Sequence, residues 1–175
     1  MINFISKVFI LFFIFTSSTL SEKIEKIEIN GNKRISNETI LVLGAIKIGE
    51  DFTSNNLNES LKKLYETNFF SDIELILENG LLKIELDENP IIEKINIRGI
   101  KKKSFVEQIY ESISLKDRMS FTEDAFNGDV NLIKNILQSS GYYFSEINVE
   151  RETNLDLNSV ILNLDIELGE KAKID

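Results

Sequence analysis

The sequence predicts an α+β fold of two tandem β-α-α-β-β modules, each a three-stranded mixed sheet with two helices on one face. Two repeated segments are the first evidence. The strand-like stretch 27–31 (Ile-Glu-Ile-Asn-Gly) returns as 95–99 (Ile-Asn-Ile-Arg-Gly), and the helix-like stretch 61–65 returns as 133–137. The third observation is that alternating and helical hydrophobic periods follow one another in the same order in both copies. A repeat of roughly 70 to 80 residues is one small domain rather than one turn of a solenoid.

Residues 1–21 are predicted to be a secretory signal peptide that precedes the fold. Lys7 is their only charged residue, residues 8–15 form an unbroken apolar run, and residues 16–21 are mostly small and polar. The apolar run is much shorter than the roughly 20 residues of a membrane-spanning helix. The mature chain is therefore expected to begin near Glu22, outside the cytoplasm. An uncleaved anchor remains the alternative, because weak apolar character continues beyond this run.

The first module is expected over residues 22–90. It opens with the alternating strand at 27–31, which a glycine turn ends. Two helices come next, the first capped by Ser36 and the second by Ser54. The second helix carries an apolar stripe at spacings of three and four residues, which consists of Leu57, Leu61, Leu64 and Tyr65.

A hairpin closes the first module. Apolar and polar residues alternate over the predicted strands 71–78 and 81–87, and Asn79-Gly80 between them is a dipeptide favoured in two-residue type I′ turns. Pro90, the only proline, falls at the boundary between the two copies. The linker is therefore expected to be only a few residues long, with the two modules in contact.

The second module is expected over residues 91–170, with the same elements in the same order. Ser104 is predicted to cap its first helix and Thr122 its second, and Gly141 is a typical stop for the second helix. A second hairpin follows, whose first strand covers residues 145–153.

Composition excludes several classes of function. The chain has 20 basic and 29 acidic residues, a formal net charge of −9, and neither histidine nor cysteine. A strongly acidic surface repels phosphate backbones, so no nucleic acid is expected as a partner. Without imidazole or thiolate groups, conventional Ser-His-Asp and Cys-His catalysis and most zinc sites are excluded. Exported modules without cysteine must fold by core packing alone, which favours a Gram-negative periplasm.

We therefore expect that the chain is not an enzyme and that it binds neither a metal nor a cofactor. Residues 154–165 imitate a calcium-binding loop only loosely, because Ser159 stands where that loop requires glycine, and we interpret 154–158 as a hairpin turn. A secreted carboxylate-based hydrolase stays open as an alternative of a different class. Two buried, convergent acids would be the discriminating observation for it.

Taken together, these residues resemble the POTRA (polypeptide-transport-associated) domain family over the whole mature chain. The string at 61–73, Leu-Lys-Lys-Leu-Tyr followed by Asn-Phe-Phe-Ser-Asp-Ile, is fairly specific for it. The first copy is similar to the first POTRA module of BamA-type outer-membrane β-barrel assembly factors. Two positions depart from the family pattern, since Asn68 replaces a glycine and Ile100 replaces an asparagine. The resemblance implies a full-length form with an outer-membrane β-barrel, so residues 171–175 are expected to begin a truncated third module.

The candidate functional site is the free edge of each sheet. If the first strand joins the second strand of the hairpin in parallel, the first strand of the hairpin is left at the edge, where its backbone can receive an extended peptide. The candidate residues are Asp72, Ile73, Glu74, Leu75 and Ile76 in the first module and Glu146, Ile147, Asn148, Val149 and Glu150 in the second. Four of them are expected to hold the core, namely Ile73, Leu75, Ile147 and Val149. Binding should therefore depend on the edge backbone.

The resemblance implies a periplasmic polypeptide-binding array of an outer-membrane protein assembly factor, at the periplasmic face of a Gram-negative outer membrane. The expected partners are unfolded outer-membrane protein clients and assembly lipoproteins. A related translocator, TamA-like or of the two-partner secretion kind, is the alternative within the same family. A single-module cell-division protein of the FtsQ kind is disfavoured by the two copies and the short apolar leader.

Overall fold

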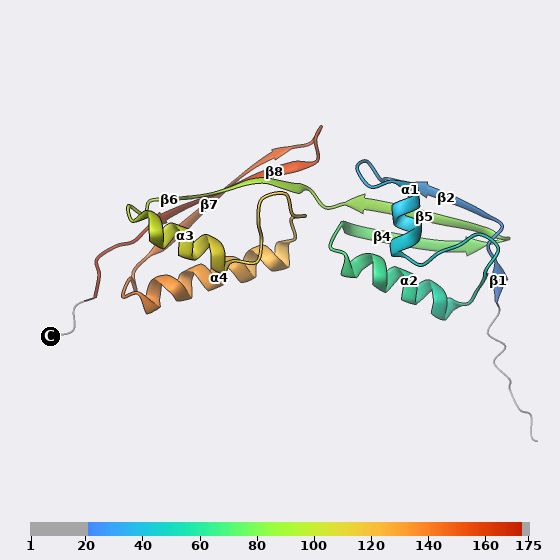
Figure 1. Ribbon diagram of the computed structural model, residues 1–175, viewed down its shortest axis with the longest axis horizontal. Helices are drawn as coiled ribbons and strands as arrows, with labels where there is room; N and C mark the ends of the chain where they lie inside the picture. The colour runs from blue at the N-terminus through green and yellow to red at the C-terminus, as the bar shows by residue number, and fades with distance from the viewer. Residues whose placement is uncertain (1–20, 173–175) are drawn as a thin grey trace, which may run out of the picture.

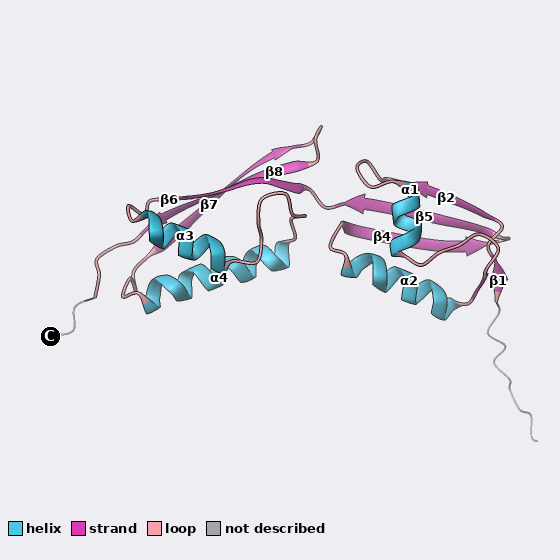
Figure 2. Cartoon of the chain, viewed as in Figure 1, coloured by secondary structure: helices cyan, strands magenta, loops and turns pink. Residues whose placement is uncertain are grey.

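A computed structural model describes residues 21–172, and it confirms the predicted α+β fold (Figures 1 and 2). Module 1 consists of β1 (Glu22–Lys23), β2 (Lys26–Asn30), α1 (Asn37–Leu43), β3 (Asp51–Phe52), α2 (Ser54–Glu66), β4 (Phe70–Glu78) and β5 (Leu81–Glu88). Module 2 consists of β6 (Ile91–Arg98), α3 (Lys103–Ser112), α4 (Glu123–Ser139), β7 (Glu146–Asn154) and β8 (Ser159–Glu167). The predicted signal peptide lies outside the described residues except for its last position. Of the predicted start of a third module, residues 173–175 lie outside the described residues, and 171–172 belong to no helix or strand.

Each sheet has the last strand of its module at the centre. In module 1, β5 lies between β2, which runs parallel to it, and β4, which runs antiparallel. In module 2, β8 lies in the same way between β6 and β7. The predicted parallel addition of the first strand is therefore confirmed in both modules. The short antiparallel pair of β1 and β3 in module 1 is a feature that the sequence did not indicate.

The two helices of each module cover one face of its sheet, and the core lies between these layers (Figure 2). In module 1, Ile40 of α1 and Leu64 of α2 are completely buried, and the inward residues of β5 are buried with them. Module 2 has a separate core of the same construction, in which Ile109 of α3 and Ile133 of α4 pack against β8. Each module thus buries its own apolar residues.

Helix ends follow the predicted capping residues at most positions. Ser36 and Thr122 cap α1 and α4 through their side chains. Gly141, with φ +92°, ends α4, where the N–H groups of residues 141 and 142 donate to carbonyl oxygens of the last turn. The predicted caps of the other two helices are wrong. Thr53 rather than Ser54 caps α2, because Thr53 and Asn56 bond each other reciprocally, and Ser104 lies inside α3, whose N-cap Lys102 makes no side-chain bond.

The glycine that ends the first strand in both copies has a structural reason. Gly31 and Gly99 both have φ +88°, in the left-handed region. A Cβ atom would lie 1.8 Å from the Leu86 carbonyl oxygen at Gly31, and 1.9 Å from the Ile166 carbonyl oxygen at Gly99. The repeated motif therefore ends in glycine because the central strand passes directly beside it.

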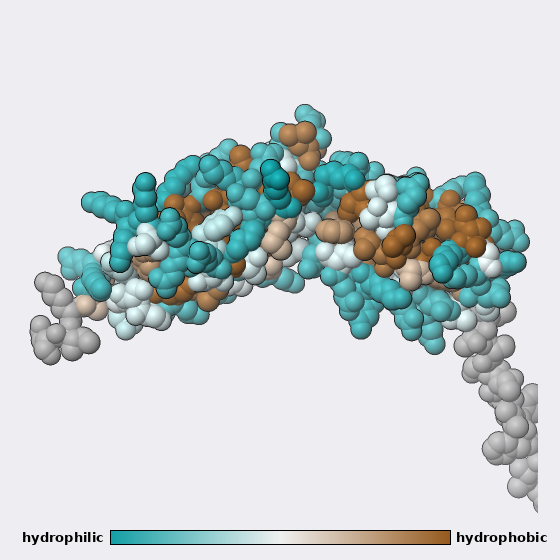
Figure 3. Space-filling model, viewed as in Figure 1, coloured by the Kyte–Doolittle hydropathy of each residue, from teal (hydrophilic) through white to brown (hydrophobic). Residues whose placement is uncertain are grey.

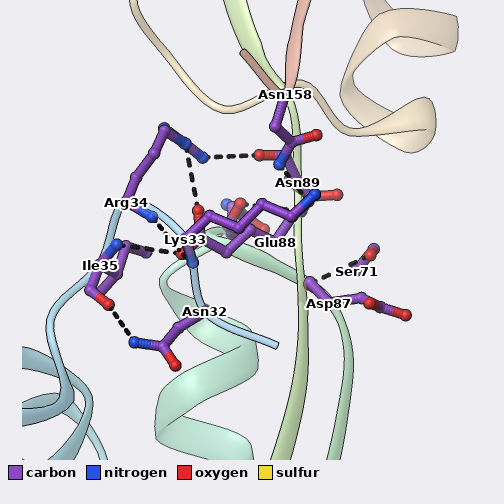
Figure 4. A network of polar contacts seen from close by, with 10 residues as sticks. Asn32, Lys33, Arg34, Ile35, Ser71, Asp87, Glu88, Asn89 and Asn158 are labelled. Carbon is purple, nitrogen blue, oxygen red and sulfur yellow. Dashed lines mark hydrogen bonds and ion pairs between the residues drawn. The ribbon is translucent and has the colours of Figure 1, made fainter. Parts of the chain in front are cut away.

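The two modules meet at a linker of two residues, Asn89 and Pro90 (Figure 4). The Asn89 N–H donates to the Phe69 carbonyl oxygen at 2.8 Å. From module 2, the Asn158 side chain donates to the Glu88 carbonyl oxygen at 2.9 Å. Because both modules bond this segment, they are in contact, as the position of Pro90 predicts.

Candidate functional site

Each sheet has two edges, one more than the sequence argument named. The outer strands are β2 and β4 in module 1 and β6 and β7 in module 2 (Figure 1). β4 and β7 are nine residues long, whereas β2 has only five and β6 has eight. The predicted strands are therefore the long edges of the two sheets.

The edge of β6 is partly occupied by the loop between α3 and α4. The Ile92 N–H donates to the Met119 carbonyl oxygen at 2.8 Å, and the Ile92 carbonyl oxygen accepts from the Arg118 N–H at 2.7 Å. Further along, the Ile95 N–H donates to Asp117 Oδ1 at 3.0 Å. The first half of β6 is thus closed to another strand, and β7 is the longer open edge of module 2.

In β4, the backbone groups that face the edge can be assigned from one hydrogen bond. The Ile73 N–H donates to the Tyr65 hydroxyl at 3.1 Å, so it points away from β5. Successive residues of an antiparallel strand point alternately to the partner strand and away from it. The N–H groups of Leu75 and Leu77 therefore face the open edge as well, while those of the residues between them face β5.

The same argument applies to β7 through its neighbour β8. The Ile91 N–H of β6 donates to the Asn158 carbonyl oxygen at 2.9 Å, so the even-numbered residues at the start of β8 face β6 and the odd-numbered residues face β7. In the β7–β8 register, the odd-numbered residues of β8 pair with the even-numbered residues of β7, whose N–H groups therefore face β8. The edge-facing N–H groups of β7 are therefore those of Ile147, Val149, Arg151 and Thr153.

The candidate site residues lie along these two strands, with alternating side chains. On the face away from the helices, six of them are exposed, namely Asp72, Glu74, Ile76, Glu146, Asn148 and Glu150. Ile73 is buried, while Leu75 and Ile147 are partly buried against the cores. The expectation that Val149 holds the core is wrong, because its side chain is 40% exposed. The helices cover the central strand more completely than the edge strand, so Leu164 of β8, opposite Val149, is only 2% exposed.

Exposed apolar side chains flank β7 at both ends. Tyr143 and Phe144, just before β7, are 60% and 79% exposed. In the turn that follows β7, Leu155 and Leu157 are 81% and 63% exposed. Figure 3 shows hydrophobic residues at the tip of this hairpin, which projects from the surface. None of these four residues was assigned to the site from the sequence, although Leu155 and Leu157 visibly interrupt an otherwise polar turn.

Among residues 21–172, two carboxylates are buried, those of Glu88 and Asp129, and each binds backbone N–H groups of its own module. Glu88 Oε1 accepts from the N–H groups of residues 33, 34 and 35 at 2.7 to 3.0 Å (Figure 4). Burial, the largest single influence, acts to raise the pKa of Glu88, but these donors and the Arg34 guanidinium together lower that pKa below its ordinary value. Asp129 in module 2 accepts from the Ser114 and Leu115 N–H groups.

These two acids lie in different modules and serve the backbone, so they are not the convergent pair that a hydrolase needs. Among residues 21–172, no group of three acidic, histidine or cysteine side chains could hold a metal ion. Within the same range, no helix has the length and apolar character required to cross a bilayer. We keep the open sheet edges as the candidate functional site.

Comparison with known proteins agrees with this architecture. Residues 22–89 and 90–169 each match the POTRA family, described as surface antigen variable number repeat. The chain belongs to the POTRA family. It is 29% identical over 159 residues to the outer membrane protein assembly factor BamA of Neorickettsia risticii, which covers 89% of this chain and 20% of that protein. It is 27% identical over 153 residues to BamA of Neisseria meningitidis, which covers 86% of this chain and 19% of that protein.

A solved structure shows the same POTRA fold. The N-terminal domain of Omp85 from Thermosynechococcus elongatus superposes with a TM-score of 0.53 at 12% identity, over 86% of this chain and 64% of that one. The chain spans about one fifth of the length of the curated relatives it matches. The relatives therefore support a POTRA array, and the activity of a whole assembly factor is a matter for proposal.

Proposed function

We propose that this POTRA array is the periplasmic, polypeptide-binding part of an outer-membrane protein assembly factor, and that it receives client β-strands by strand addition at β4 and β7. The observation that carries the proposal is the row of edge-facing N–H groups on β7. The Ile147, Val149, Arg151 and Thr153 N–H groups have no partner among residues 21–172. An extended peptide can pair with such a row through its own backbone.

Binding of this kind selects for shape rather than for sequence. Main-chain hydrogen bonds supply the affinity, which suits a receptor for many different clients. Side chains add a preference at the ends of β7, where Tyr143 and Phe144 offer exposed aromatic surface. A client strand with alternating apolar residues, as in a membrane β-barrel, has side chains that can cover this surface.

The relatives favour assembly over translocation, since both curated proteins reported above are assembly factors. We propose the periplasmic face of the outer membrane as the location of the array. Assembly lipoproteins are proposed as further partners, and a full-length form is proposed to carry a membrane β-barrel.

The proposal is tested by titrating the isotopically labelled protein with peptides from outer-membrane barrel strands. We expect dissociation constants of tens of micromolar or weaker, because a short peptide must order when it binds. Amide shifts should follow β7 and β4. Val149→Pro should weaken binding, because it removes an edge-facing donor at a side chain that contributes little to the core. Val149→Ala is the matched control, since it keeps the N–H group.

Two results would contradict strand addition. One is a set of amide shifts that maps to the helices instead of the edges. The other is unchanged binding by a folded Val149→Pro variant. Leu75→Pro and Leu75→Ala form the equivalent pair for β4, where the partly buried side chain makes a comparison of both variants necessary.

A further inference from the structure

A groove of about 550 Å³ lies between the two modules and is lined by residues of the α2–β4 turn and of the α3–α4 loop. This volume is within the range of ligand sites in proteins, roughly 300 to 1,000 Å³. Module 1 contributes residues of the loops before α1 and β4, and module 2 contributes the loop that leads into α4. The groove is separate from the outer edges of β4 and β7.

Both walls of the groove are bonded to the linker. The Phe121 N–H at the end of the α3–α4 loop donates to the Pro90 carbonyl oxygen at 2.8 Å. On the opposite side, Arg34 Nη2 donates to the Asn89 carbonyl oxygen at 2.8 Å. The groove is therefore a defined site rather than a gap between two independent bodies.

The charge of the groove is opposite to that of the chain. The chain has 29 acidic residues and a net charge of −9, yet none of the thirteen residues that line the groove is acidic and two are arginines. Arg34 already pairs with Glu88. The Arg118 side chain is exposed, and among residues 21–172 it makes no ion pair or side-chain hydrogen bond. The adjacent Asp117 is turned to the Ile95 N–H.

The groove also exposes large apolar side chains on both walls. Phe69 from module 1 is 38% exposed, and Met119 from module 2 is 46% exposed. Exposed aromatic and methionine side chains are typical of sites that bind polypeptides. A ligand that fits this groove therefore combines a carboxylate with a neighbouring apolar side chain.

We propose that the groove binds an acidic peptide segment of a partner polypeptide, in which a Glu or Asp carboxylate pairs with Arg118 and a neighbouring aromatic or aliphatic side chain packs against Phe69 and Met119. This site does not depend on strand addition, because it uses side chains and lies outside the two edges. The extended, weakly specific edges and the charged groove thus recognise different features of a polypeptide.

The test uses short peptides with blocked ends that carry a central Glu-Phe pair, a Gln-Phe pair or a Glu-Ser pair. Fluorescence anisotropy should show that the Glu-Phe peptide binds up to about fivefold more tightly than either of the others, because the Gln-Phe peptide lacks the carboxylate and the Glu-Ser peptide lacks the apolar side chain. Its binding should also weaken as salt is added.

Variants of the protein then assign the site. Arg118→Glu should weaken binding of the Glu-Phe peptide at least about tenfold. Lys134→Glu, which makes the same charge change on an exposed position of α4, should leave binding unchanged. Met119→Ser tests the apolar wall without a change of charge. Val149→Pro should not affect this peptide, which separates the groove from the edge site.

The proposal is overturned if the Glu-Phe and Gln-Phe peptides bind equally, or if Arg118→Glu and Lys134→Glu behave alike. It is also overturned if the amide shifts caused by the Glu-Phe peptide follow β4 or β7, since the peptide would then bind by strand addition. Failure of the barrel-strand peptides at the edges, with intact Glu-Phe binding, would contradict the proposed function and leave the groove assignment standing.

Discussion

The buried carboxylate of Glu88 should be among the most sensitive positions in module 1. Its side chain is 1% exposed, and its Oε1 atom is the acceptor for three consecutive N–H groups of the loop before α1 (Figure 4). Arg34 Nε lies 3.1 Å from its Oε2 atom. One side chain thus connects the end of β5 to the loop that leads from β2 to α1.

Glu88→Ala removes the acceptor for all of these donors. An unsatisfied buried donor costs roughly 1 to 3 kcal/mol, and water can reach the exposed residues 33 and 34, so we use the lower end for each donor. The expected loss is about 3 kcal/mol in the free energy of unfolding. Glu88→Gln keeps an acceptor oxygen but loses the charge, which about halves the strength of such bonds, so about 1.5 kcal/mol is expected. The exposed control Glu74→Gln should stay within about 0.5 kcal/mol.

Urea unfolding near pH 7 measures these differences, and a second series at lower pH tests their electrostatic part. The pKa of Glu88 in the folded chain is lowered from its ordinary value of 4.5. The ionised group therefore stabilises the fold fully above pH 4.5, and this contribution is lost as the pH falls through the folded pKa. The advantage of the native chain over Glu88→Gln should shrink in that range. An unfolding free energy of Glu88→Ala equal to that of Glu74→Gln would refute the reasoning.

Two further predictions concern the turns. Gly31→Ala and Gly99→Ala should each destabilise their module by more than about 3 kcal/mol, because the new Cβ would lie 1.8 to 1.9 Å from a backbone oxygen. The control Gly49→Ala, which has open space around it, should lower the free energy of unfolding by only about 1 kcal/mol. Thermal unfolding measures these differences. Asn158→Gly can adopt the local φ of +45° but loses the side-chain hydrogen bond to the Glu88 carbonyl oxygen. Amide relaxation should therefore show looser coupling of the two modules. Tumbling identical to that of the native chain would contradict a role of Asn158 in holding the modules together.

Most of the fold follows from local pattern. The alternation of apolar residues and the Asn79-Gly80 turn determine the hairpin of module 1, and both turn residues have the positive φ that a type I′ turn requires. The start of α2 was predicted wrongly, because two residues that can cap a helix stand side by side there. Thr53 prevails over Ser54 because Asn56, three residues after Thr53, returns a bond to its N–H group. Sequence periodicity cannot rank such neighbours, whereas the reciprocal pair can.

The buried acids were missed, although periodicity contained the signal for them. Glu88 continues the inward alternation of Leu82, Ile84 and Leu86 along β5, so its side chain has to enter the helix side of the sheet. Asp129 stands between Phe126 and Ile133 on the buried face of α4. An acid in phase with the core requires internal donors, and these come from loops that are distant in the sequence.

The sequence predicted which strands form the edges, but not which backbone N–H groups face outward from them. Exposure of a side chain and direction of its backbone N–H group are separate properties in a strand. Glu74 has an exposed side chain, yet its N–H group points to the central strand, whereas the partly buried Leu75 directs its N–H group to the open edge. A proline placed at Glu74 would therefore disrupt the β4–β5 ladder and leave the edge donors in place.

The two modules share a fold but offer different edges. In module 1, the Tyr65 hydroxyl accepts from the Ile73 N–H. Among the described residues, this leaves the edge-facing N–H groups of Leu75 and Leu77 without a partner for an incoming strand to bind. On β7, the edge-facing donors from Ile147 to Thr153 have no partner among the described residues. Since each added backbone pair contributes to affinity, strand addition should be stronger at β7 than at β4. Because the first half of β6 is covered, β7 is the longer open edge of module 2, and strand addition in that module is expected there.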